Sequence, residues 1–160
     1  MTVTSGSVFK NPVHFLALGF GSGLAPKAPG TAGTLVAIPL YLVLIHWLNL
    51  YAYLGAIIGA FVLGIYLCGR TASDLGVHDH GGIVWDEFVG FWITMILVPL
   101  TWYWLLAGFV LFRMFDILKP FPIGLLDKKV QGGFGIMLDD VIAGLYACAV
   151  LHTAMYFTGF

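Results

Sequence analysis

The sequence Val98-Pro99-Leu100-Thr101-Trp102-Tyr103-Trp104 controls the topology of this chain, because it interrupts an apolar run of 25 residues from Phe88 to Phe112. An unbroken run of that length would cross the roughly 30 Å hydrocarbon core of a bilayer as one helix. Proline breaks helices, and aromatic side chains gather where a membrane meets water. We therefore predict that the run forms a helical hairpin broken near Pro99, with the aromatic residues at the interface.

The charged residues on both sides of this run favour the same hairpin. Thirteen of the 15 charged residues lie in two segments, residues 70–87 and 113–140. A single span would put these segments on opposite faces of the membrane, whereas a hairpin puts them on the same face. The hairpin also places all seven Lys and Arg residues on one side, as the positive-inside rule prefers. Its limbs of 11 to 14 residues are short, which fits tilted or re-entrant helices.

The composition identifies lipid as the solvent of this chain. Hydrophobic residues make up 60% of the 160 residues and charged residues 9%, against about 25% charged residues in a soluble domain. Further apolar runs cover Thr34–Leu50, Tyr51–Cys68 and Val141–Phe157. We predict an all-α, polytopic membrane helical bundle with about four long apolar segments, forming a single domain over residues 1–160. We expect membrane lipid, and no nucleic acid, as its partner.

Two pairs of acids stand where apolar helices are predicted to begin. Asp86 and Glu87 precede one apolar run, and Asp139 and Asp140 precede another. Either pair alone is explained by helix capping, because acids favour the positive end of the helix dipole. Together with Asp116 they concentrate oxygen ligands of the kind that Mg²⁺ prefers. We predict a Mg²⁺ site and catalytic centre built from all five acids, with Asp86 and Asp139 as direct ligands.

Cations and glycines near these acids are candidates for binding a phosphate. Residues 21–34 form a Gly/Pro-rich loop at a predicted helix entry, where backbone amides attract anions and where Lys27, Gly30 and Thr31 are available. Arg113 and Lys119 flank Asp116. The simpler interpretation is that Lys27 contacts anionic lipid and that Arg113 makes a surface salt bridge.

The histidines of the first polar segment give a weaker signal. His78 and His80 flank Asp79, and imidazoles can bind zinc or manganese. A spacing of two residues in a loop is not typical of a metal site, so we favour a polar loop that supports the acids. Their role stays open.

Four ordered blocks of this sequence resemble the bacterial phosphatidylglycerophosphatase A family. They are P-K-A-P-G-T-x-G at Pro26–Gly33, I-V-W-D-E-F-V-G at Ile83–Gly90, F-R-x-F-D-x-x-K-P-x-P at Phe112–Pro122 and G-G-x-G-I-M-x-D-D at Gly132–Asp140. The resemblance implies a Mg²⁺-dependent phosphoric monoester hydrolase that converts phosphatidylglycerophosphate to phosphatidylglycerol and inorganic phosphate. It also implies a multi-pass protein of the bacterial cytoplasmic membrane, with its active site facing the cytoplasm.

Two other classes of protein are less consistent with the sequence. A phospholipid-forming phosphotransferase would also use acids at the membrane boundary, but the D-G-x-x-A-R signature expected of it is missing. A transporter or channel would carry ionisable residues in the middle of its spans. Here His46 and His152 lie towards span ends, which favours an interfacial site over a conduit.

Overall fold

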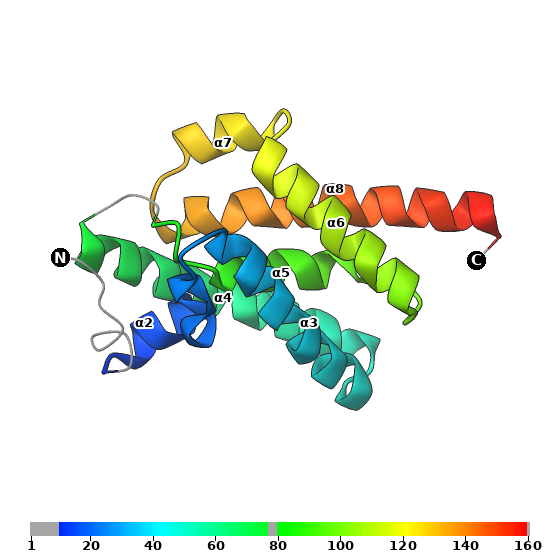
Figure 1. Cartoon of the computed structure of the whole chain (residues 1–160), viewed down its shortest axis with the longest axis horizontal. Helices are drawn as coiled ribbons and strands as arrows, with labels where there is room; N and C mark the ends of the chain where they lie inside the picture. Colours follow the sequence, from blue (N-terminus) through cyan, green and yellow to red (C-terminus); the bar gives the residue numbers. More distant parts are fainter. Residues whose placement is uncertain (1–9, 77–79, 160) are drawn as a thin grey trace.

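The computed structural model describes residues 10–76 and 80–159, and these residues form helices without any strand (Figure 1). In chain order the elements are α2 (Pro12–Ala17), the 3-10 helix η1 (Gly19–Leu24), α3 (Pro29–Trp47), α4 (Leu50–Leu75), α5 (Trp85–Thr94), α6 (Trp102–Leu118), α7 (Ile123–Lys129) and α8 (Gly132–Thr158). The predicted all-α class is confirmed.

Three of the helices are long and apolar enough to cross a membrane: α3 with 19 residues, α4 with 26 and α8 with 27. The runs predicted as spans at Tyr51–Cys68 and Val141–Phe157 lie within α4 and α8, and the run Thr34–Leu50 overlaps α3 as far as Trp47. Asn49 separates α3 from α4 and caps α4 by accepting a hydrogen bond from the Ala52 amide at 3.0 Å. A short polar cap is therefore enough to turn the chain between two long helices.

The run from Phe88 to Phe112 is divided between α5, with 10 residues, and α6, with 17. Residues 95–101 separate the two helices, and this connection contains Pro99 and Leu97, whose φ of 55° is left-handed. Neither helix reaches the length of the three candidate spans within the described residues. The break near Pro99 thus lies where it was expected, while the path of the hairpin through the membrane stays a prediction.

Helix α8 begins earlier than the sequence suggested, and this corrects one expectation. Asp139 and Asp140 lie about two turns inside α8 rather than at its entry, because Gly132–Gly135 form its first turn. A Cβ atom on Gly133 would collide with the Ile65 carbonyl oxygen and lie 2.7 Å from the Gly69 nitrogen. Gly133 therefore allows close packing of α8 against α4, and the glycines of this segment belong to the helix and do not form a loop.

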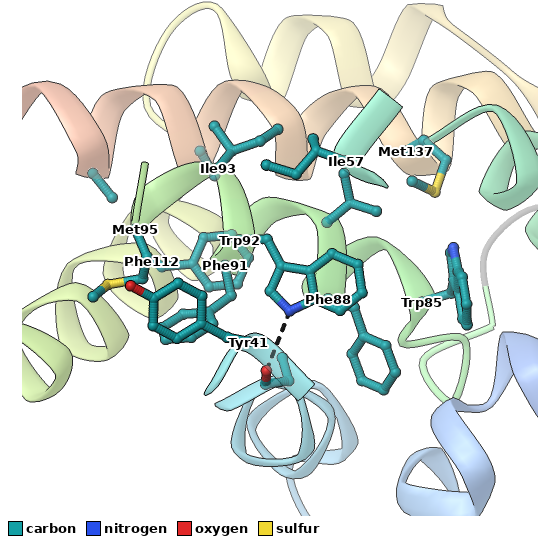
Figure 2. Close-up of a cluster of buried hydrophobic side chains, with 14 of the residues drawn as sticks. Tyr41, Ile57, Trp85, Phe88, Phe91, Trp92, Ile93, Met95, Phe112 and Met137 are labelled. Carbon is teal, nitrogen blue, oxygen red and sulfur yellow. Dashed lines mark hydrogen bonds between the residues drawn. The ribbon is translucent and has the colours of Figure 1, made fainter. Parts of the chain in front are cut away.

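The core lies where α5 is enclosed by α3, α4 and α8. Figure 2 shows Trp92 of α5 pointing towards α3, where its Nε1 donates a hydrogen bond to the Ala37 carbonyl at 3.2 Å. The Tyr53 hydroxyl of α4 donates to the Trp92 carbonyl at 2.7 Å. The polar side-chain atoms of Trp92 and Tyr53 are thus hydrogen-bonded, and α5 is held in place from two sides.

Candidate active site

Three acids from two helices meet at one end of the bundle. Asp86 and Glu87 occupy the first turn of α5, as predicted, and Asp140 comes from α8. Each offers a carboxylate oxygen, and the three oxygens lie within 4.8 Å of one another. A Cβ on Gly144 would collide with the Gly90 carbonyl oxygen, so glycine allows the close contact of α5 and α8 that brings the acids together.

The three acids, which we call the acid cluster, have the properties of a cation site. Glu87 and Asp140 are only 7% and 2% exposed, and Asp86 is half-buried. Among the described residues no group forms a hydrogen bond with Glu87 Oε2 or Asp140 Oδ2. Burying several carboxylates together is costly unless a positive charge neutralises them. Because all the donors are oxygens, the arrangement fits a hard divalent cation such as Mg²⁺.

Arg113 brings a positive charge to the acid cluster. Its Nη1 lies 2.6 Å from Asp116 Oδ2 and 3.5 Å from Glu87 Oε1, and its side chain is 14% exposed. Arg113 and Asp116 share one face of α6, as their spacing predicted. The simpler interpretation of a surface salt bridge does not fit a guanidinium buried against a second helix.

The amino end of α3 reaches the same place. A Cβ atom on Gly30 would collide with Glu87 Oε1 and lie 2.8 Å from Arg113 Nη2. Glycine at position 30 therefore lets the backbone of α3 approach both charged groups closely. The predicted glycine-rich helix entry and the acids, which lie more than fifty residues apart in the sequence, are neighbours in the structure.

Lys119 joins α7 and α8 from the end of α6. Its Nζ lies 2.7 Å from Asp139 Oδ2 and 3.0 Å from Asp127 Oδ1. Partial burial opposes the charge, but the hydrogen bonds and attraction of Asp139 and Asp127 outweigh it and hold the pKa of Lys119 above its usual range. Asp127 was not among the predicted site residues, because one charge in a polar segment has no distinguishing pattern.

Asp139 and Asp140 consequently have different surroundings. The sequence favoured Asp86 and Asp139 as direct ligands, whereas the structure places Asp140 in the acid cluster and pairs Asp139 with Lys119. Asp139 Oδ1 is nevertheless buried without a hydrogen bond among the described residues. The role of Asp139 as a ligand stays a prediction, and so does that of Asp116, which binds Arg113.

The other predicted site residues are not members of the acid cluster. Lys27 is exposed in the loop before α3, and Thr31 is half-buried in the first turn of that helix. His80 Nδ1 accepts a hydrogen bond from the Gly82 amide at 3.1 Å, as expected of a polar turn. His78 and Asp79 lie outside the described residues.

The fold and the site together define the class of protein to which this chain belongs. This is a helical protein with membrane-length helices, whose buried acids and arginine are suited to holding a cation and a phosphoryl group. The chain belongs to the phosphatidylglycerophosphatase A family, because the model of that family matches residues 15–155. It therefore stands among phosphoric monoester hydrolases.

Two of three relatives have the name of this family, and the third has another phosphatase name. A Haemophilus influenzae protein named phosphatidylglycerophosphatase A is 53% identical over 91% of this chain and 90% of its own length. An Escherichia coli protein of the same name is 50% identical over 89% of this chain and 83% of its own. A Bacteroides thetaiotaomicron protein, provisionally named a phosphatidylinositol-3-phosphatase, is 39% identical over 90% and 94%. No solved structure matches the chain.

Proposed function

We propose that this protein hydrolyses phosphatidylglycerophosphate to phosphatidylglycerol and inorganic phosphate, with Mg²⁺ held by Asp86, Glu87 and Asp140. The observation that supports this most strongly is the buried acid cluster beside Arg113 and the amino end of α3. The names of the Haemophilus influenzae and Escherichia coli relatives support the choice of substrate. The reaction is part of glycerophospholipid biosynthesis.

The residues of the chain suit the hydrolysis of a phosphomonoester. When bound, Mg²⁺ supplies positive charge and Lewis acidity at the acid cluster. The Arg113 guanidinium can donate to two phosphoryl oxygens at once and neutralise the charge that develops on them. Because Gly30 has no side chain, the amino end of α3 can lie directly against Glu87 and Arg113. The first amides of α3 have no acceptor within the helix and can donate to a phosphoryl oxygen, while Lys27 and Thr31 lie close by in the sequence.

A phosphate assay on the purified protein in detergent tests the proposal. We expect phosphate release from phosphatidylglycerophosphate that requires added Mg²⁺ and stops with a chelator. Phosphatidic acid and phosphatidylinositol 3-phosphate should be poorer substrates by kcat/KM. A clear preference for phosphatidylinositol 3-phosphate would contradict the proposed substrate, and undiminished release in chelator would contradict the metal.

We further propose that the acid cluster faces the cytoplasm in the bacterial inner membrane, with both ends of the α5–α6 hairpin on that side. Single cysteines at Ser73 and Lys129, both exposed, should then label from the same face of oriented vesicles. A cysteine at Leu100, in the exposed connection between α5 and α6, should label from the opposite face. The background carries Cys68→Ala and Cys148→Ala. Labelling of the Ser73 and Lys129 positions from opposite faces would contradict the hairpin.

A further inference from the structure

A groove beside α7 is lined by residues outside the acid cluster. Its volume is about 290 Å³, and it is lined by Lys119, Phe121, Gly124, Leu125 and Lys128. Lys119 connects the two places, because its Nζ also binds Asp139, the neighbour of Asp140 in α8. A ligand that spans the groove and the acid cluster would therefore pass along the Lys119 side chain.

The charges of the groove favour an anion with a single negative charge. Lys119 is already paired with Asp127 and Asp139. Lys128 is exposed, and within residues 10–76 and 80–159 no ion pair includes it. One lysine thus remains to bind an incoming anion. A phosphodiester carries one negative charge and has two free oxygens that accept hydrogen bonds from an ammonium group.

The apolar side of the groove favours a lipid over a soluble phosphate. Phe121 is 81% exposed, and Leu125 lies exposed beside it. An exposed apolar stripe also runs along α6 towards the groove. Its members recur every three or four residues and are Leu106, Val110, Met114 and Ile117. An acyl chain lying against this stripe would carry its head group to the end of α6, where the groove begins.

We infer that the groove binds the phosphodiester of the phospholipid substrate, while the terminal phosphomonoester reaches the acid cluster. This inference rests on the proposed function and adds the basis of its specificity. Phosphatidylglycerophosphate carries both phosphates, joined by a glycerol unit. Phosphatidic acid carries only the monoester and leaves Lys128 without a partner. The groove therefore selects a lipid with a second phosphate.

Two neighbouring lysines provide a matched test. Lys128 lines the groove and Lys129 does not, although both are exposed and carry the same charge. In uncharged detergent micelles, Lys128→Gln should raise KM for phosphatidylglycerophosphate about fivefold, the effect of one partly exposed charged contact, with a smaller change in kcat. It should weaken binding of phosphatidylglycerol, which retains the diester, by a similar factor in a direct titration. Lys129→Gln should change neither value.

The other possible outcomes distinguish an error in the role of the groove from an error in the proposed function. Equal losses for both variants would mean that the lysines only attract anionic lipid in general, and would overturn the inference. Unchanged KM and phosphatidylglycerol affinity in Lys128→Gln would also overturn it, while leaving the proposed function standing. Wild-type protein that releases no phosphate from phosphatidylglycerophosphate would refute the proposed function itself, whatever the titration gives.

Discussion

Asp140→Asn should reduce phosphate release from phosphatidylglycerophosphate by about a hundredfold or more, the scale on which the loss of one charge-stabilising group acts. Asparagine keeps the size of the side chain but removes the negative charge that attracts a divalent cation. Asp140 is buried in the acid cluster with one oxygen that has no hydrogen bond among the described residues. Asp86→Asn should have an effect of the same order, because Asp86 offers the cluster its oxygen from α5.

The measurement is phosphate release against Mg²⁺ concentration, combined with the thermal transition at each concentration. Mg²⁺ that binds only the folded protein raises its transition temperature, and this increase should disappear in Asp86→Asn and Asp140→Asn. Asp74→Asn is the matched control, since Asp74 pairs with Arg70 and His14 on the surface of α4. Mg²⁺ curves for the two cluster variants that coincide with the wild type would eliminate the cation site.

Asp139→Asn tests whether Asp139 is a direct Mg²⁺ ligand, as the sequence suggested, or acts through Lys119, as its contacts in the structure suggest. The sequence favoured Asp139 over Asp140 as a direct ligand, but only Asp140 joins the acid cluster, while Asp139 binds Lys119 at 2.7 Å. If Asp139 acts through Lys119, its variant should retain Mg²⁺-dependent stabilisation and lose part of its substrate affinity. Loss of the Mg²⁺ response in Asp139→Asn would restore it as a direct ligand.

Features that depend on neighbouring residues could be predicted from the sequence. Pro99 removes a backbone donor and cannot continue a helix, so the division between α5 and α6 follows from local chemistry. Asp86 and Glu87 lie in the first turn of α5, as expected of acids that precede an apolar run. Length and hydropathy likewise identified α3, α4 and α8, because a membrane imposes both on its helices.

Features that depend on contacts between distant segments could not be predicted in the same way. Glycine is usual in loops, yet Gly133 lies inside α8 because the backbone of α4 leaves no room for a side chain there. Asp139 and Asp140 therefore lie inside the helix, and each has a different neighbour. Gly30, Glu87 and Arg113 come from three separate segments that meet in the structure. Their order in the sequence does not show that they are close in space. The four blocks of family resemblance contain all of these residues, but not their pairing.

Arg113→Met should lower kcat by roughly a hundredfold to a thousandfold while leaving Mg²⁺ binding intact or tighter. The guanidinium lies 3.5 Å from Glu87 Oε1, so its removal takes away a positive charge that competes with a cation for the same carboxylate. Turnover should nevertheless fall, because the donor that neutralises the reacting phosphoryl oxygens is lost. The acid variants should lose both Mg²⁺ affinity and turnover. Loss of turnover in Arg113→Met without loss of Mg²⁺ affinity would therefore identify Arg113 as a phosphate ligand.

Arg113→Lys and Arg70→Met complete this experiment. Lysine retains the charge but not the planar pair of donors, so Arg113→Lys should recover only part of the lost kcat. Arg70 forms an ion pair with Asp74 on the exposed surface, and Arg70→Met should behave as the wild type. Because Arg113 also binds Asp116 at 2.6 Å, its variants must first show a cooperative thermal transition. Near-normal kcat in a folded Arg113→Met would mean that the arginine only neutralises Asp116 and Glu87, and that the phosphoryl group is bound elsewhere.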